Sequence, residues 1–485
     1  MAGVKVLIAN RGEIAVRIER TLRDMDFASV AVFSNPDRNA LHVINADIAV
    51  EIGGDTPATS YLDMGKILWA ARKSGAKAIH PGYGFLSERP DFAREVIEHG
   101  LIFVGPDPEA MERAGDKVEA RRTAAMAGVP LLEGTDAVES VEDAIRLASK
   151  VGYPLMIKAA AGGGGKGMRI ARSEEELKEL FPVASAEAKA AFGDGRLYLE
   201  RLVLNPHHIE VQIIADKHGN VFALGERECS LQRRHQKFIE ETPSPIIDER
   251  TRRDIQEAAV AFAKAIGYTN AGTVEFLYDE DRGKFYFLEM NARLQVEHPI
   301  TEMTTGLDLV ALQMKVALGE RLNLGQVQRR GHSIEARINA EDPYEDFAPS
   351  TGRVEFLLEP AGPFTRTDSG IFAGYEVPVF YDPILAKVIT WGPDRETARR
   401  RLLRALSEYR LFGLRTNIPY LKAVLESEPF RRGRYTTNFS KEFVFKPEYP
   451  DYLYYIAVAE PPKRKITPTP QKVSLWKMFK DYSEY

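Results

Sequence analysis

Residues 286–302 read YFLEMNARLQVEHPITE, and candidate functional residues are denser in this stretch than elsewhere in the chain. From 288 to 297 apolar and polar residues alternate without a break. A period of two is typical of an extended segment with one apolar face and one polar face. The polar members of the run are Glu289, Asn291, Arg293, Gln295 and Glu297.

The upstream residues predict a hairpin. The run 272–278 (GTVEFLY) resembles a strand, 279–284 a turn, and Phe285 begins the returning strand. A turn centred on Arg282 places Glu275 directly opposite Glu289. Cross-strand neighbours lie about 4.5–5.5 Å apart and like charges there repel, so we expect a cation between them.

Glu275 and Glu289, together with the amide oxygen of Asn291, form an all-oxygen ligand set that suits Mg²⁺ or Mn²⁺. The alternative is a solvated edge strand whose charges have no function. A straight strand from Glu289 to Glu297 would span about 26 Å, too far for both ends to serve one small substrate. We therefore expect the chain to leave the strand after about Asn291 and to fold back as a loop.

A glycine-rich segment separates two further predicted strands, 154–158 and 168–171. Its glycines match G-x-G-x-x-G, but a strand follows instead of a helix, which argues against a dinucleotide site. Lys166 is followed by Gly and not by Ser or Thr, which argues against a P-loop. The segment is either a flap whose backbone closes over phosphates, with Lys158 and Lys166 as cations, or a flexible surface hairpin.

The N-terminal part predicts a doubly wound parallel sheet. Strands at 4–9, 28–33, 76–80 and 101–104 alternate with helical patterns. Ligands bind beyond the carboxyl ends of such strands. Tyr83 and Glu88 follow one of these ends and are therefore candidate site residues, although a purely structural role is equally compatible with the pattern.

The remaining segments are less specific. Residues 198–203 predict a short strand, and Glu200 with the backbone of 201–203 could form hydrogen bonds to the edge of an adenine ring. The basic run 227–237 is, from composition alone, a solvated face. Residues 333–390 are rich in strands, and helices are expected at 116–128, 307–318, 395–410 and 418–426. The proline-rich segment 446–471 indicates a linker.

Bulk properties exclude several classes of protein. The 485 residues carry a net charge of -5 with a pI near 6.1, which indicates neither a nucleic-acid nor a membrane partner. The single cysteine, Cys229, cannot form an internal disulfide, so a reducing cytoplasmic location is expected and a nucleophilic role is not. No signal peptide or membrane-spanning run is expected.

Five motifs together resemble biotin carboxylase, the ATP-grasp enzyme of biotin-dependent carboxylases, over roughly residues 4–445. They are IANRGEI at 8–14, IHPGYGFLSE at 79–88, GGGGKGM at 162–168, ECSLQRRHQK at 228–237 and EMNARLQVEHP at 289–299. The resemblance implies an N-terminal doubly wound α/β domain (1–114), an ATP-grasp linker and glycine-rich lid (115–203), an ATP-grasp core (204–330), a mixed C-terminal domain (331–445) and a tail (446–485).

The resemblance also implies roles for individual residues. Catalytic roles fall on Lys237, Arg293, Glu297 and Arg366, and metal binding on Glu275, Glu289 and Asn291. Binding of nucleotide, bicarbonate or biotin falls on Tyr83, Lys117, Lys158, Gly163, Gly164, Gly165, Lys166, Gly167, Glu200, Arg201, Leu202, Val203, His208, Gln232, His235, Leu277, Gln295 and Val296. The basic run is thereby expected to be functional instead of solvated.

The implied activity is carboxylation of biotin by ATP, Mg²⁺ or Mn²⁺ and bicarbonate. Lys477 is followed by only eight residues, so we expect biotin to be held by a separate carrier protein, with carboxyl transfer by a separate carboxyltransferase, and the tail to be a docking element. The resemblance alone implies a homodimer. Neither the sequence nor the resemblance identifies the final carboxyl acceptor. The alternatives are another ATP-grasp ligase, similar to carbamoyl-phosphate synthase, and a non-catalytic component of a carboxylase complex.

Overall fold

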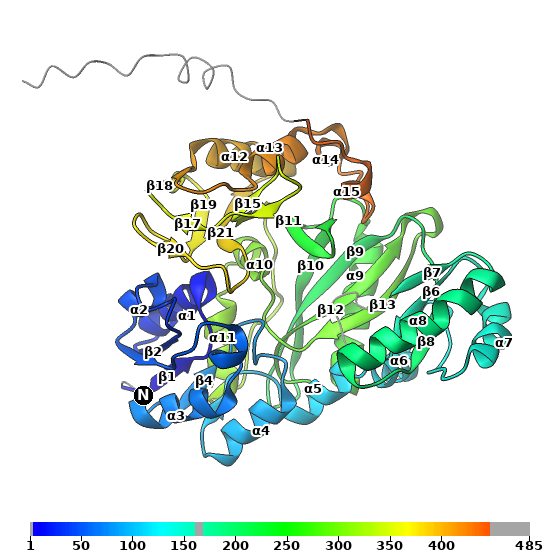
Figure 1. Ribbon diagram of the computed structural model, residues 1–485, viewed down its shortest axis with the longest axis horizontal. Helices are drawn as coiled ribbons and strands as arrows, with labels where there is room; N and C mark the ends of the chain where they lie inside the picture. Colours follow the sequence, from blue (N-terminus) through cyan, green and yellow to red (C-terminus); the bar gives the residue numbers. More distant parts are fainter. Residues whose placement is uncertain (1–2, 161–167, 447–485) are drawn as a thin grey trace, which may run out of the picture. The chain divides into compact units, whose positions relative to one another are not determined.

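The computed structural model of the chain describes residues 3–160 and 168–446 (Figure 1). The expected phosphate-binding glycines Gly163, Gly164, Gly165 and Gly167, with Lys166, lie outside the described residues, as does the predicted docking tail from 447 onward. Residues up to Val444 form one compact unit. Within the described ranges, no helix is long and apolar enough to cross a membrane.

The N-terminal part is a parallel sheet, as predicted, but it has five strands instead of the four that the sequence indicated. Its order is β3 (Ile48–Glu51), β2 (Ala28–Phe33), β1 (Lys5–Ile8), β4 (Ala78–His80) and β5 (Ile102–Phe103). The helices of this part are α1 (Gly12–Asp24), α2 (Leu41–Asn45), α3 (Met64–Ser74), α4 (Pro90–Glu98) and α5 (Pro108–Gly115). Strand β3 escaped prediction because it is short and lies at the sheet edge, where only Val50 of its four residues is buried.

A small antiparallel sheet follows, in the order β7 (Arg169–Ala171), β6 (Leu155–Ala159) and β8 (Leu197–Arg201). It is accompanied by α6 (Lys117–Met126), α7 (Val141–Val151) and α8 (Glu174–Phe192), and Figure 1 shows α7 and α8 beside its strands. Leu155, Leu199 and Phe181 belong to a hydrophobic core of its own. Both strands that were expected to flank the glycine loop are therefore present.

A large antiparallel sheet carries the candidate site. Its order is β13 (Lys284–Asn291), β12 (Asn270–Asp279), β9 (His207–Ala215), β10 (Val221–Arg233), β11 (Gln236–Thr242), β14 (His332–Asn339), β21 (Ile384–Gly392) and β19 (Thr365–Ser369). The sheet runs without interruption across the expected domain boundary at residue 330. That division of the chain into domains stays a prediction.

The remaining elements surround the large sheet. The helices are α9 (Glu249–Ala265), α10 (His298–Thr305), α11 (Leu309–Ala317), α12 (Arg395–Glu408), α13 (Ile418–Glu426), α14 (Glu428–Arg431) and α15 (Phe439–Glu442), with 3-10 turns at Pro57–Thr59 and Glu280–Arg282. Short strands are β15 (Glu341–Asp342), β16 (Ala348–Pro349), β17 (Gly352–Arg353), β18 (Phe356–Leu358), β20 (Glu376–Val377) and β22 (Arg410–Phe412).

The β12–β13 hairpin has the predicted register, with Glu275 directly opposite Glu289. Phe287 is buried between Phe262 of α9 and Phe276, and burial of each such side chain contributes about 1.5–3 kcal/mol. This packing fixes which face of the hairpin is polar. Strand β13 ends at Asn291, as predicted, and α10 begins at His298, with Pro299 in its first turn.

Candidate active site

Lys237 is the centre of a buried ionic cluster at the start of β11. Its ammonium nitrogen lies 2.5 Å from Glu210 Oε2, 3.2 Å from Glu275 Oε1 and 2.7 Å from Glu297 Oε1. Burial alone lowers the pKa of Lys237, but the three carboxylates outweigh it and hold that pKa well above its ordinary value. One cation therefore joins carboxylates from β9, β12 and the loop before α10.

Two arginines complete the charge balance around this cluster. Arg227 is fully buried and donates to Glu210, to Gln212 at 2.7 Å and to Thr273 at 3.1 Å. Arg337 on β14 lies between Glu240 and Glu297; its Nε is 2.6 Å from Glu240 Oε1 and an Nη is 2.9 Å from Glu297 Oε2.

Glu297 is consequently held as an anion. Burial raises its pKa, but Lys237, Arg337 and Arg227 outweigh that effect and hold the pKa well below its ordinary value. A buried carboxylate with cations on both oxygens can accept a proton only when one of these cations turns to another anion. The geometry thus suits a base that is released by substrate binding.

The predicted metal ligands lie beside the lysine cluster. Glu275 faces Glu289 across the hairpin, Asn291 Nδ2 donates to Glu275 Oε1 at 2.8 Å, and Lys117 Nζ is 3.4 Å from Glu289 Oε2. Two carboxylates and an amide oxygen are the hard oxygen donors that Mg²⁺ and Mn²⁺ prefer. The residues present therefore fit a divalent ion.

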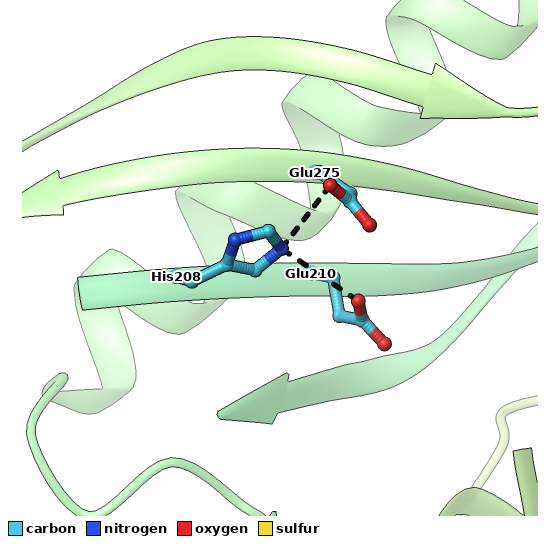
Figure 2. A group of neighbouring side chains, drawn as sticks. All are labelled: His208, Glu210 and Glu275. Atoms are coloured by element: carbon cyan, nitrogen blue, oxygen red, sulfur yellow. Dashed lines mark ion pairs between the residues drawn. The ribbon is translucent and has the colours of Figure 1, made fainter. Parts of the chain in front are cut away.

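His208 enlarges the candidate ligand set (Figure 2). It lies on β9 with Glu210, and Figure 2 shows its ring directed between Glu210 and Glu275 of the neighbouring strand. Its Nε2 is 3.2 Å from Glu275 Oε2 and 3.9 Å from Glu210 Oε2, and it has no hydrogen-bond partner within the described chain. One ligand atom from each of the three residues lies within 4.8 Å of the others.

The loop of residues 292–297 is held by the segment that follows β4 and by β21. Arg293 Nε donates to Glu88 Oε2 at 2.8 Å, and Glu88 Oε1 accepts from the Ala292 amide at 3.1 Å. Another nitrogen of Arg293 donates to Gln295 Oε1 at 3.0 Å, and Lys387 Nζ donates to the carbonyl of Val296 at 2.9 Å. The segment that follows β4 thus shapes the predicted bicarbonate site.

The expected nucleotide residues divide into two groups. Lys158 and Glu200 form a buried ion pair on β6 and β8, and Arg121 also pairs with Glu200. Arg201, Leu202 and Val203 follow, each half-buried. In the large sheet, Leu277 lies opposite His208, and Gln232 lies opposite Lys237. His235 is exposed at the tip of the β10–β11 turn, with a φ of 64°.

The two expected biotin residues have partners outside the lysine cluster. Arg366 on β19 pairs with Glu302 at 2.7 Å and with Asp368 at 2.6 Å. Tyr83 donates its hydroxyl to Glu13, which is 3.2 Å from Lys387. Lys387 therefore connects Tyr83 to the carbonyl of Val296 in the bicarbonate loop.

The solvated-face interpretation of 227–237 was wrong over most of its length. Arg227, Glu228, Cys229 and Leu231 are buried, and only the tip residues 234–236 are exposed. These residues are buried because β10 and β11 lie in the middle of the large sheet, with other strands on both sides. Burial raises the pKa of the Cys229 thiol well above its ordinary value, which does not suit a nucleophile.

Sequence reasoning missed Glu210, Glu240 and Lys387 and gave Arg337 no role. The alternation His208, Glu210, Gln212 was a signal for Glu210, because it places all three on one face of β9. Arg337 and Lys387 had no local signal, since both reach the cluster through the order of strands in the sheet.

These features define an enzyme that binds ATP and a divalent metal ion and belongs to the ligase class. Family models match three consecutive segments: the biotin carboxylase N-terminal domain at 3–111, the carbamoyl-phosphate synthase L chain ATP-binding domain at 116–325 and the biotin carboxylase C-terminal domain at 335–442. The chain therefore belongs to the biotin carboxylase family, and the resemblance found in its motifs is confirmed.

Relatives and solved structures agree with the family models. The chain is 51% identical to a biotin carboxylase from Nostoc sp., covering 90% of this chain and 98% of the relative. It is 49% identical to biotin carboxylase 1 of Bacillus subtilis, again covering 90% of this chain and 98% of the relative. A biotin carboxylase structure from Campylobacter jejuni superposes with a TM-score of 0.88 at 44% identity, covering 90% of this chain and 98% of that one.

A second structure records bound ligands. It is the biotin carboxylase domain dimer of the 2-oxoglutarate carboxylase from Hydrogenobacter thermophilus, in complex with MgADP, ADP and bicarbonate. It superposes with a TM-score of 0.87 at 46% identity and covers 90% of this chain and 97% of that one. The predicted fold class, with a parallel N-terminal sheet and a large antiparallel sheet, is thereby confirmed.

Proposed function

We propose that this chain carboxylates biotin with ATP and bicarbonate, releasing ADP and phosphate. The observation that carries the proposal is Lys237, which joins the metal-ligand candidate Glu275 to the base candidate Glu297. Phosphate activation and bicarbonate activation can thus occur side by side. The structure of the relative with bound MgADP and bicarbonate supports the proposal that this chain binds a nucleotide and bicarbonate together.

The nucleotide end of the site depends on charge neutralisation. Glu275, Glu289 and Asn291 would hold a divalent ion, and this ion, when bound, neutralises charge on the phosphoryl oxygens. Lys117 and Lys158 supply further positive charge near the phosphates, and Lys158 is already positioned by Glu200. The adenine ring of ATP would contact the half-buried side chains of Leu202, Val203 and Leu277. Glu200 and Arg201 would lie beside the adenine.

The bicarbonate end depends on Arg293, Lys237 and Glu297. Arg293 can hold bicarbonate in a bidentate manner, aided by Gln295 and the backbone of Val296. A bicarbonate oxygen attacks the γ-phosphorus, the bond to the ADP oxygen breaks, and carboxyphosphate forms. Glu297 takes the proton of bicarbonate as general base, and carboxyphosphate then separates into CO₂ and phosphate.

Biotin is carboxylated in the last step. The released phosphate takes the proton from N1 of biotin, and N1 attacks CO₂. Arg366 would stabilise the negative charge on the ureido oxygen, and Tyr83 would bound the biotin pocket. Both side chains are half-buried and bonded to carboxylates, so each is positioned before biotin arrives.

We infer that the assembly resembles that of the relatives. The partners are a biotin carrier protein and a carboxyltransferase, and the chain forms a homodimer, as the 2-oxoglutarate carboxylase domain does. A cytoplasmic location stays the expectation from the single cysteine. The division into domains at 114, 203, 330 and 445 and the role of the tail also belong to the proposal.

One assay tests this function. Phosphate release from Mg·ATP is measured with and without bicarbonate and free biotin. We expect release to require bicarbonate and to rise when biotin is added. A carbamoyl-phosphate-synthase-like ligase, the alternative raised by the central family model, would respond to bicarbonate and an amine but not to biotin. A rate unaffected by biotin rejects the proposed function, and no release at all supports a non-catalytic role in a carboxylase complex.

A further inference from the structure

Two glutamates face each other where β11 joins β14. Glu240 lies directly opposite Glu335 in the antiparallel register, and neither side chain is exposed. Directly opposed Cβ atoms are about 4.5–5.5 Å apart. Two ionised carboxylates at that spacing, away from water, repel strongly.

The hydrogen bonds of this pair are incomplete. Glu240 Oε1 accepts from Arg337 at 2.6 Å, but Glu240 Oε2 and both oxygens of Glu335 have no hydrogen-bond partner among the described residues. An ionised carboxylate buried in this way costs several kcal/mol. A neutral carboxylic acid, in contrast, can donate its proton to an open carboxylate oxygen. A proton between Glu335 and Glu240 would give Glu240 Oε2 and one oxygen of Glu335 a hydrogen-bond partner at once.

The cations around the pair are already engaged. Arg337, on the same strand as Glu335, binds Glu240 and Glu297. Lys387 on β21 donates to the Val296 carbonyl at 2.9 Å and lies 3.2 Å from Glu13. Neither is hydrogen-bonded to Glu335.

Lys237, whose charge opposes the rise in the pKa of Glu240, is engaged with Glu210, Glu275 and Glu297. The remaining polar groups on this side do not supply a positive charge. Glu297 in the loop before α10 is an anion. The hydroxyl of Tyr83 is bonded to Glu13. His298 of α10, the helix that packs on β14, is neutral because burial holds its pKa well below the ordinary value.

Titration behaviour agrees with this geometry. Burial raises the pKa of Glu335 well above its ordinary value, with the charge of Lys387 opposing and that of Glu240 adding to the rise. Burial raises the pKa of Glu240 to about 7, although Arg337 opposes it. Both shifts disfavour a second negative charge on the pair near neutral pH.

We propose that Glu240 and Glu335 share one proton, and that the single negative charge of this pair holds Arg337 in place against Glu297. The proton moves only between carboxyl oxygens of the two residues, so no other reactant is needed. The inference rests on the proposed function and adds Glu240 and Glu335 to it as positioning residues. Neither is expected to touch substrate.

The arrangement has a consequence for the base. Arg337 divides its positive charge between Glu240 and Glu297. When the charge on Glu240 is removed, Arg337 pairs with Glu297 alone, and Glu297 becomes a weaker base. Loss of Glu240 should therefore change the pH dependence of turnover, whereas replacement of protonated Glu335 by a neutral amide should not.

Three variants of the full chain test the pair by biotin-dependent phosphate release across pH. For Glu240→Gln we expect a fall in kcat of about tenfold to a hundredfold, a shift of the acidic limb of the pH profile to lower pH and an ATP KM within about twofold. For Glu335→Gln we expect a kcat within about threefold of the unmodified chain, because a neutral donor remains. The double variant should match Glu240→Gln, since the two changes act on one charge.

A matched control comes from the next residue. Glu241 is equally buried on β11 but faces the other side of the sheet, where it pairs with Arg395 and His332. Glu241→Gln should leave the pH profile of turnover unchanged even if it lowers stability. A shift of the acidic limb in this control would mean that any buried charge loss on β11 produces the effect, and would overturn the positioning role.

Infrared spectroscopy tests the shared proton without any turnover. We expect the unmodified chain at neutral pH to show a protonated carboxyl band that is lost in Glu335→Gln. A missing band, or a kcat loss in Glu335→Gln as large as that in Glu240→Gln, would show that Glu335 is ionised and would overturn the inference. If biotin has no effect on the unmodified chain while the band behaves as expected, the proposed function fails and the proton-sharing pair stands.

Discussion

The ammonium nitrogen of Lys237 lies 2.7 Å from Oε1 of Glu297, the residue we assign as general base. The contact keeps Glu297 deprotonated but also makes it a poor proton acceptor, because a positive charge lowers the pKa of a neighbouring carboxyl. An anionic substrate that draws Lys237 away would restore the basicity of Glu297. The pair therefore couples bicarbonate binding to proton transfer.

Replacing Lys237 by Gln should separate these two effects. Without the cation, the pKa of Glu297 rises toward its ordinary value, so the acidic limb of the pH profile should move to higher pH. Turnover should fall by about 10²–10⁴-fold, because bicarbonate and the transferred phosphoryl group lose a positive charge. Phosphate release measured over roughly pH 5.5 to 9 checks both results. Lys264→Gln on the exposed side of α9 is the control, and an unmoved limb would contradict the coupling.

Replacing Glu297 by Gln should remove the base while preserving the shape of the site. Biotin-dependent phosphate release should fall by about 10²–10⁴-fold, the usual contribution of a general base. The Kd of ATP, measured by calorimetry, should change by no more than about twofold, since Glu297 contacts Lys237 and Arg337 and not the nucleotide residues on β6 and β8. Glu257→Gln, exposed on α9, serves as the control. A large loss of ATP affinity would refute the assignment.

Glu289 should contribute to metal binding and not to folding. It is half-exposed and opposed by Glu275, so its ionised side chain gains a partner when a divalent ion binds. Glu289→Gln should weaken Mn²⁺ binding in the presence of ADP by at least about tenfold, measured by electron paramagnetic resonance. Thermal stability without metal should be unchanged or slightly higher. Asp281→Asn at the exposed hairpin turn is the control, and equal Mn²⁺ affinity in both variants would remove Glu289 from the ligand set.

The hairpin register followed from local pattern alone. The alternation of 288–297 and the turn near Arg282 placed Glu275 opposite Glu289, and the span argument ended the strand at Asn291. Local pattern could not reveal that β9 lies beside β12, or β14 beside β11. These neighbours are decided by long-range packing. Glu210, Arg337 and Glu240 therefore became part of the site only in the folded sheet.

The family resemblance supplied the roles that spacing could not. Arg366 and Tyr83 are far from the central stretch in sequence, and neither has a local motif that predicts biotin binding. The same holds for Lys117, which reaches Glu289 from the start of α6. Those assignments stay predictions until the variants are measured. The exposed position of His235 at the β10–β11 tip makes its assigned role the one that most needs such a measurement.

The ion pair between Glu241 and Arg395 predicts a pH-dependent loss of stability on the far side of the sheet. Both oxygens of Glu241 are bonded to Arg395, and His332 and Tyr435 contact them as well. Burial raises the pKa of Glu241, but Arg395 and His332 outweigh it and lower that pKa to about 2. Because the folded-state value is depressed, the stabilisation is complete above the unfolded pKa and is lost as pH falls toward 2. A shift of this size corresponds to about 3 kcal/mol at neutral pH.

Glu241→Gln should therefore lower the thermal midpoint clearly at pH 7 and by a smaller amount near pH 3. At pH 7 the variant leaves Arg395 buried against a neutral amide, a loss that costs about 3–5 kcal/mol when a buried pair is broken. As the pH falls from 7 to 3 this carboxyl becomes protonated in the unfolded state, while in the folded state, where its pKa is about 2, it stays largely ionised, so the difference between the two midpoints narrows. Circular dichroism melts of both chains at several pH values give the comparison, with Glu426→Gln, exposed at the end of α13, as the control. A difference that stays constant from pH 7 to pH 3 would show that Glu241 stabilises the sheet through packing instead of charge.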